Sequence, residues 1–151
     1  MENHSDEIDT IKYSMINSYN AGDLGEEIFY LLIHDGDGRS EISISRIYKK
    51  SFMVSIYGQK RYESGINGYY LSEEEYNNFV KYLVDNNVDS YKNFRNGKID
   101  SEAEYLYMHC SEDGISSFRF IEPSTEKSEK YADLIRAFVS LIENFKPEVE
   151  S

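Results

Sequence analysis

A helix that carries its own start signal is the strongest constraint in this sequence, because its single apolar stripe has to be covered. Within the run from Tyr70 to Asn87, Ser72 and Glu75 have the S-x-x-E spacing of a capping box, in which each side chain satisfies the other residue's backbone N–H. Leu71 and Tyr76 have the spacing of the hydrophobic staple that flanks such a cap. The apolar residues that recur at helical spacing are Tyr76, Phe79, Val80, Leu83 and Val84. The pattern predicts a helix that packs against a sheet along one side.

Segments with the periodicity of strands lie on both sides of this helix and supply the sheet. Residues 28–33 are apolar at every position and predict a central strand, whereas residues 41–45 alternate as in a strand with one wet face. Residues 52–57, 103–110 and 115–121 predict further strands, residues 58–65 a polar hairpin loop, and residues 125–145 a closing amphipathic helix. The expected fold class is therefore α+β, an antiparallel β-meander sheet with two amphipathic helices packed on one face, in a single domain of residues 1–151.

The N-terminal region allows two interpretations. We expect residues 1–9 to form a flexible arm. In residues 10–20, Ile11, Tyr13 and Met15 alternate with polar residues, which favours a strand. The rival interpretation is a helix, because apolar residues also recur there at helical spacing; these are Ile8, Ile11, Met15, Ile16 and Tyr19. We take the strand as the expectation.

The charge and the cysteine content narrow the class of protein. Acidic residues outnumber basic residues by 28 to 16 among the 151 residues, which gives a formal net charge of −12. This charge argues against nucleic acid and anionic membranes as partners and favours rapid association with a basic protein. Cys110 is the only cysteine, so no internal disulfide can form. Because the first residues lack the features of a signal peptide and no apolar run is long enough to span a membrane, we expect a cytoplasmic protein, as a monomer or a homodimer.

Alternation along the strands sorts the side chains by face. The side chains expected to face the two helices are Ile42, Ile44, Phe52, Val54, Ile56, Leu106, Met108, Cys110, Phe118 and Phe120. The side chains expected on the opposite, uncovered face are Glu41, Ser43, Ser45, Met53, Tyr57, Tyr105, Tyr107, His109, Ser117 and Arg119. An exposed face rich in tyrosine suits protein binding, because Tyr buries a large area at little entropic cost. The alternative is that Tyr is only a good strand former on a wet face.

Acidic residues around the last two predicted strands complete a candidate binding site. They lie at the ends of one hairpin, beside the tyrosines, where charge would speed association with a basic surface and the tyrosines would supply affinity. The predicted partner-binding residues are Tyr57, Asp100, Glu102, Glu104, Tyr105, Tyr107, Glu112 and Asp113.

No pattern in the sequence indicates catalytic residues, a metal site or a cofactor. The run Asp35-Gly36-Asp37-Gly38 lacks the spacing of a calcium-binding loop and fits a hairpin turn better. His34 and Asp35 could pair a base with its orienting acid, but no nucleophile stands in a recognisable motif. His109 and Cys110 are neighbours in a strand and so point to opposite faces, which makes Cys110 a core residue. Zinc spacing and a phosphate-binding glycine run are also missing from the sequence.

Four segments carry a resemblance to a known class of proteins. They are Ile11-Lys12-Tyr13-Ser14, Asp35-Gly36-Asp37-Gly38, Tyr70-Leu71-Ser72-Glu73-Glu74 and the strand-and-helix pattern of residues 103–145. In this order, and over most of the chain, the pattern resembles the small acidic immunity proteins of bacterial toxin systems. The resemblance implies a cytoplasmic protein that binds and blocks a cognate toxin and has no catalytic residues of its own.

Three functions are compatible with these observations. The preferred one is a non-enzymatic inhibitor that occludes a basic toxin, such as a nuclease, with acidic and tyrosine side chains. The alternative is a phage-encoded nucleic-acid mimic that blocks a host defence enzyme, which would require rows of carboxylates at phosphate-like spacing. The least favoured is a small enzyme that uses His34 or His109.

Overall fold

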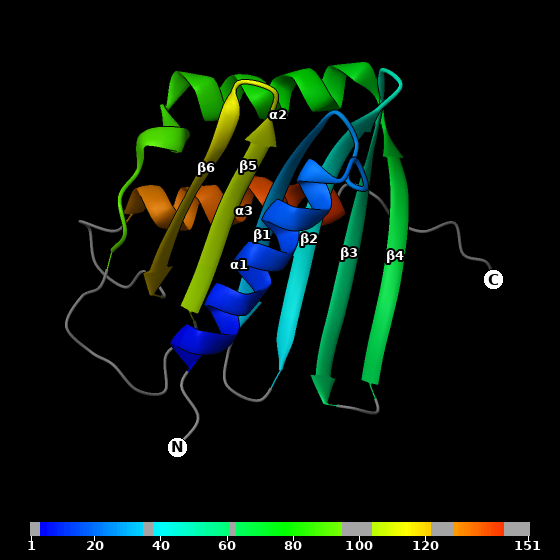
Figure 1. The fold of residues 1–151 in the computed structure, drawn as a ribbon. Coiled ribbons are helices and arrows are strands. Elements are labelled where there is room, and N and C mark those ends of the chain that lie inside the picture. The colour runs from blue at the N-terminus through cyan, green and yellow to red at the C-terminus, as the bar shows by residue number, and fades with distance from the viewer. Residues whose placement is uncertain (1–3, 35–37, 61–62, 95–103, 122–128, 144–151) are drawn as a thin grey trace.

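The computed structural model describes residues 4–34, 38–60, 63–94, 104–121 and 129–143. Figure 1 shows a sheet with helices on both of its faces. The helices are α1 (His4–Asn20), α2 (Glu73–Asp85), α3 (Glu129–Glu143) and the short 3-10 helix η1 (Val88–Ser90). The strands are β1 (Glu27–His34), β2 (Arg39–Ile47), β3 (Lys50–Lys60), β4 (Glu63–Leu71), β5 (Glu104–Ser111) and β6 (Gly114–Ile121).

The six strands form one antiparallel sheet in the order β4-β3-β2-β1-β5-β6. Strands β1 to β4 form the expected meander, and the β5–β6 hairpin adds to the other side of β1. The central strand β1 is therefore paired along both edges, with Phe29 opposite Ile44 of β2 and opposite His109 of β5. This position explains why the sequence of β1 is apolar on both faces.

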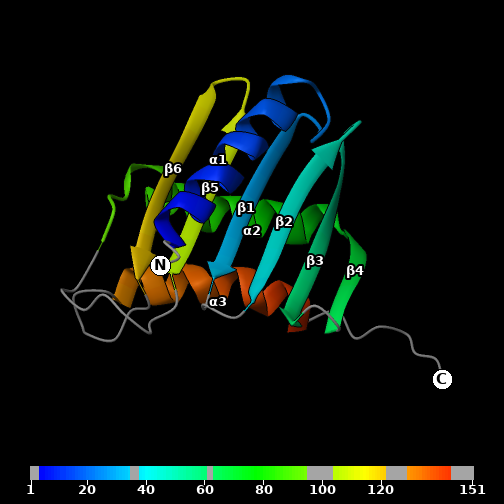
Figure 2. The same cartoon turned by 60° about the horizontal axis from the view of Figure 1, so that its bottom comes forward.

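Helices α2 and α3 cover one face of the sheet, and α1 covers part of the other (Figure 2). The core beneath α2 and α3 includes Phe29, Leu31, Ile44, Met53, Tyr107, Phe118, Phe79, Leu134 and Phe138. The core beneath α1 consists of Ile8, Ile28, Tyr30, Leu32, Leu106, Met108 and Cys110, with partly buried α1 residues packed against it. The α+β class and the pair of helices on one face are confirmed, and a third helix covers the second face.

The strand predicted over residues 10–20 is wrong, because those residues belong to α1. The rival helical spacing describes the structure: Ile8 is fully buried, and Ile11, Met15, Ile16 and Tyr19 pack against the same core. Helix α1 begins at His4, so most of the expected flexible arm is helical too. The exposed residues of α1 that follow Asp9 are uncharged, which weakened the helical signature of this part of the sequence; they are Thr10, Tyr13, Ser14, Asn17 and Asn20.

The capped helix is confirmed as α2. The Ser72 hydroxyl accepts a hydrogen bond from Glu75 N at 3.0 Å, and the Glu75 carboxylate accepts one from Ser72 N at 2.9 Å. Tyr76, Phe79 and Leu83 are buried beneath the helix, whereas Val84 is exposed. The hairpin loop predicted over residues 58–65 is wrong in extent, because β3 continues to Lys60 and β4 starts at Glu63. Residues 35–37 of the predicted Asp-Gly turn lie outside the described residues.

The predicted assignment of side chains to faces is partly wrong. Phe118 and Phe120 do face α2 and α3, but their cross-strand partners are Tyr107 and Tyr105. Opposite residues of an antiparallel pair share a face, so both tyrosines also face those helices. The residues placed on the wrong face are Leu106, Met108, Cys110, Tyr105, Tyr107, His109, Met53, Phe52 and Val54. Ile42 and Ile44 are buried as expected.

Candidate functional site

The structure separates the eight predicted partner-binding residues. Tyr105 and Tyr107 are 8% and 0% exposed, so the prediction that they form an exposed binding face is wrong. Glu104 is buried and accepts hydrogen bonds from the Arg119 guanidinium at 2.8 and 3.0 Å. Asp100 and Glu102 lie outside the described residues, as does the side chain of Tyr57, whose backbone belongs to β3.

Glu112 and Asp113 are exposed, as expected, at the turn between β5 and β6. They line a cleft of about 530 Å³ that no single segment of the sequence forms. The lining comes from the end of α1, the start of β1, the end of β2 and the β5–β6 turn, and comprises Tyr19, Glu26, Glu27, Arg46, Ser111, Glu112 and Asp113. Four carboxylates and one guanidinium therefore surround this space, which we name the acidic cleft.

A tight turn and two hydrogen bonds fix the backbone beside the acidic cleft. Tyr48 and Lys49 both have positive φ angles, 53° and 67°, and form the two-residue turn between β2 and β3. Positive φ at both residues is the geometry of a type I′ hairpin turn. The Glu26 carboxylate accepts a hydrogen bond from Tyr48 N at 3.0 Å, and the Tyr19 hydroxyl donates to the Glu26 carbonyl at 3.0 Å. These bonds tie the ends of α1 and β2 to the start of β1.

Glycine is required at position 25, which precedes the cleft residues of β1. Gly25 has a φ of 90°, and a Cβ there would lie 2.6 Å from Ile47 Cγ1 and 2.7 Å from the Arg46 carbonyl oxygen. The backbone can pass this close to β2 only without a side chain. The close passage brings Glu26 and Glu27 beside the cleft.

Behind the acidic cleft, an imidazole is held between two carboxylates. His109 Nδ1 lies 2.6 Å from Asp89 Oδ2, and His109 Nε2 lies 2.6 Å from Glu27 Oε2. The second oxygens of the two carboxylates accept hydrogen bonds from hydroxyl groups, Tyr107 to Asp89 and Tyr76 to Glu27, each at 2.9 Å. We name His109, Asp89 and Glu27 the imidazole clamp. It fastens η1 to β1 and β5, and both nitrogens of its imidazole are engaged.

The carboxylates determine the protonation state of the clamp. Burial alone would lower the pKa of His109, but hydrogen bonds to Asp89 and Glu27 outweigh it and raise the pKa to about 9. The bond from His109 lowers the pKa of Glu27, against the effect of burial. Burial would raise the pKa of Asp89, but the bond from His109 lowers it. At pH 7 the clamp therefore holds an imidazolium between two carboxylates, with a net charge of −1.

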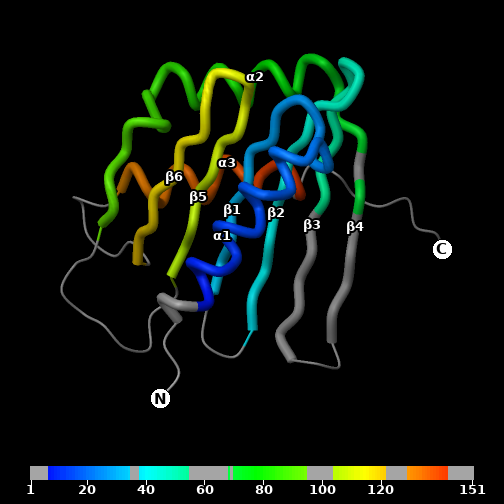
Figure 3. Tube along the Cα trace, viewed as in Figure 1, coloured from blue at the N-terminus to red at the C-terminus, as the bar shows by residue number. Residues whose placement is uncertain are grey.

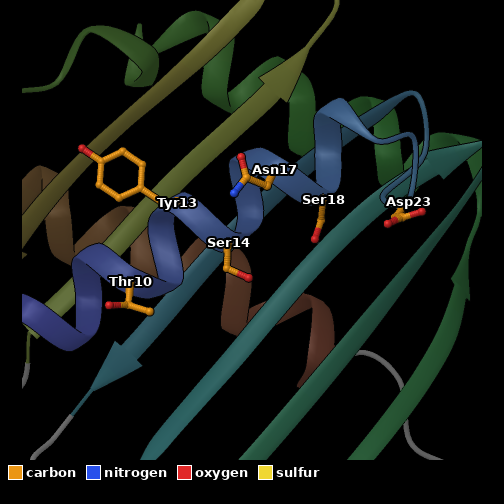
Figure 4. Close-up of a pocket in the computed structure, with 6 residues that line it drawn as sticks. All are labelled: Thr10, Tyr13, Ser14, Asn17, Ser18 and Asp23. Atoms are coloured by element: carbon orange, nitrogen blue, oxygen red, sulfur yellow. The ribbon is translucent and has the colours of Figure 1, made fainter.

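A second hollow lies on the outer face of α1 and is shallow and polar (Figure 4). Its lining residues are Thr10, Tyr13, Ser14, Asn17, Ser18 and Asp23. Tyr13 is 59% exposed, with the Lys12 ammonium 5.8 Å from its ring centre. Asp23 is the only acid in this lining, so the hollow offers hydrogen-bonding groups with little charge.

The other histidine considered in the sequence, His34, is buried at the end of β1 and bonds Glu7 of α1 through Nε2 at 3.0 Å. Its expected partner Asp35 lies outside the described residues. Cys110 is buried as expected, and burial raises its pKa to about 11. Within the described ranges no group of three or more His, Cys, Asp or Glu residues could hold a metal ion.

Glu26, Glu27, Tyr19 and Arg46 are cleft residues that the sequence did not reveal. They are separated along the chain, and only the register of β1 with its neighbours brings them to one end of the sheet. No known protein family and no curated protein matches this sequence. None of the helices in the described part of the chain is long and apolar enough to cross a membrane.

Proposed function

We propose that this protein is an immunity-type inhibitor that neutralises a basic protein toxin by binding it at the acidic cleft. The observation that carries the proposal is the cleft itself, which gathers four carboxylates from two segments around one guanidinium in a protein of net charge −12. A space of this kind suits a Lys or Arg side chain of a partner, whose charge the carboxylates attract.

The carboxylates of the cleft are of two kinds. Glu27 is already bound to His109 and Tyr76, so its position is fixed within the fold. Glu112 and Asp113 are exposed and have no ion-pair partner among the described residues. We assign the first contact with the partner to these two residues. Exposed charges chiefly raise the association rate, and salt screens them over about 8 Å at physiological ionic strength.

Calorimetry and stopped-flow mixing with the protein encoded beside this chain's gene test the proposal. We expect nanomolar affinity that weakens from 50 to 300 mM NaCl. The double variant Glu112→Gln/Asp113→Asn should lower affinity at low salt by roughly tenfold, mainly through the association rate. The matched control Glu129→Gln/Asp133→Asn removes two carboxylates of α3 and should bind like wild type. No binding, salt-independent binding, or equal effects of both double variants would refute the proposal.

The described charges favour this function over a nucleic-acid mimic. Cations are interspersed among the acids, because guanidinium groups pair with carboxylates in several places: Arg39 with Glu41, Arg46 with Glu73, Arg119 with Asp9 and Glu104, and Arg136 with Asp133. A mimic requires uninterrupted rows of carboxylates at phosphate-like spacing. A functional role as an enzyme finds less support at His109, since both of its nitrogens already contact carboxylates.

A further inference from the structure

The turn between β2 and β3 has a backbone conformation that disfavours both of its residues. Tyr48 and Lys49 have φ angles of 53° and 67° and form this two-residue turn. Gly and Asn reach such angles at little cost and dominate turns of this type, whereas the Cβ of most other residues crowds a neighbouring carbonyl oxygen. Two residues without this freedom stand next to each other here, so the turn is strained.

The fold gains little from the ring of Tyr48. The residue is 85% exposed, the highest fraction among the large hydrophobic residues described. Its backbone N–H donates to the Glu26 carboxylate, and any residue except proline would supply that donor. Residues held in such strained conformations cluster at functional sites, where the surrounding structure keeps them in place. The strain and the exposure together indicate that the ring serves a contact outside this chain.

The strained turn lies at the rim of the acidic cleft. Glu26 lines the cleft and also accepts the hydrogen bond from Tyr48 N, at 3.0 Å. Arg46, another lining residue, precedes Tyr48 by two positions, and its carbonyl accepts a hydrogen bond from Glu26 N at 2.8 Å. Figure 3 traces β2 through this turn into β3, beside the loop that joins α1 to β1. An exposed aromatic residue is thus fixed next to the four carboxylates of the cleft.

We propose that Tyr48 is the main source of affinity in the toxin-binding surface, where its ring covers the apolar stem of the basic side chain that enters the acidic cleft. This inference rests on the proposed function and identifies a residue that the cleft alone does not include. Lys and Arg both combine an apolar stem with a charged end, and an aromatic face attracts the cation as well. Tyr is enriched among residues that dominate binding energy, because it buries a large area with few rotatable bonds.

Tyr48 and the exposed acids should act on different rate constants. The charges of Glu112 and Asp113 act over a distance, so they chiefly raise the association rate and lose their effect in salt. Contact with an aromatic ring forms only in the docked complex and is not screened by salt, so it chiefly slows dissociation. This contrast distinguishes the two contributions in one set of measurements.

The turn itself provides variants that separate binding from stability. Tyr48→Asn removes the ring and introduces the residue favoured at the first position of such a turn, so it should raise the melting temperature by about 2 to 4 °C. Lys49→Gly introduces the residue favoured at the second position and keeps the ring. Tyr13→Gln removes another exposed tyrosine, on the outer face of α1, and is the matched control for loss of a ring.

Stopped-flow mixing with the protein encoded beside this chain's gene, at 50 and 300 mM NaCl, tests the inference. Tyr48→Asn should raise the dissociation rate by roughly 10- to 30-fold at both salt concentrations and change the association rate by less than about twofold. Tyr48→Phe keeps the ring and should change the dissociation rate by less than about threefold. Lys49→Gly and Tyr13→Gln should dissociate like wild type.

The outcomes separate this inference from the proposed function. If wild type binds with the expected dependence on salt but Tyr48→Asn dissociates at the wild-type rate, or weakens binding only through association, Tyr48 does not supply the affinity and the acidic cleft remains the binding site. A wild type that binds nothing, or binds independently of salt, overturns the proposed function and this inference together. A Tyr48→Asn variant that melts below wild type contradicts the strain assigned to the turn.

Discussion

The imidazole clamp makes a quantitative prediction about stability. Replacing His109 with Gln removes the imidazolium between Asp89 and Glu27 and leaves two carboxylates whose negative charge a neutral amide cannot balance. The pKa of His109 is about 9 in the folded protein and 6.5 ordinarily. Because the folded value is the higher one, protonation stabilises the fold, fully below pH 6.5, and this contribution is lost as the pH rises through 9.

The magnitude follows from the two pKa values. Linkage gives a contribution of about 3 kcal/mol at pH 6, about 1.4 kcal/mol at pH 8 and less than about 0.5 kcal/mol at pH 9. These values are upper limits on the stabilisation by His109, because the Asp89 side chain is 41% exposed and solvent screens its interaction with the imidazolium. At acidic pH the clamp also weakens, since the lowered pKa values of Asp89 and Glu27 mean that protonating them costs stability.

Urea unfolding of wild type and His109→Gln from pH 6 to pH 9 measures the effect, and the other histidines cancel because both chains contain them. The difference in the free energy of unfolding should be largest near pH 6 and shrink by about 2 to 3 kcal/mol by pH 9. Asp89→Asn, which keeps a hydrogen-bonding group but removes one charge, should show about half of this pH dependence. A difference that stays constant with pH would refute the assigned charge state of the clamp.

Three further substitutions probe other parts of the fold by urea unfolding. Ser72→Ala removes the cap of α2 and should cost about 1 kcal/mol; no loss would contradict the capping box. Ile8→Ala should cost about 2 to 4 kcal/mol because Ile8 is fully buried beneath α1, whereas a strand with a frayed arm would lose little. Gly25→Ala should destabilise by well over about 1 kcal/mol because its methyl group would collide with Ile47. Gly22→Ala has a similar φ of 85° with nothing within 4 Å and should cost clearly less.

The parts of the fold with local signals could be predicted from the sequence. The start of α2 is determined locally, since Ser72 and Glu75 are three positions apart and hydrogen-bond one another. The apolar run of β1 likewise predicted a central strand, and β1 is paired along both of its edges. Such features depend on residues a few positions apart, which is the range over which periodicity is informative.

The errors concern features that depend on distant residues. The apolar residues of 10–20 fit both the alternation of a strand and the spacing of a helix. Burial of Ile8 against β1 and β5 favours the helix. Tyr105 and Tyr107 alternate with apolar residues and were therefore predicted to lie on a solvent-exposed face. In the structure α1 covers the face expected to be exposed, so both faces of β5 are buried. Only the register with Phe118 and Phe120 assigns the tyrosines to a face. The acidic cleft was hidden for the same reason, because it is assembled from four separate segments.

The central place of β1 in the sheet has a consequence for synthesis of the chain. One edge of β1 can close as soon as β2 emerges, but the other waits for β5, about 70 residues later. At typical ribosomal speeds, roughly 5–20 residues per second, this interval lasts about 4 to 14 s. Throughout that time a run of six apolar residues, Ile28 to Ile33, presents an open template to other nascent chains. Slower translation between β2 and β5 therefore lengthens the exposure of this edge and raises the chance that it pairs with another chain.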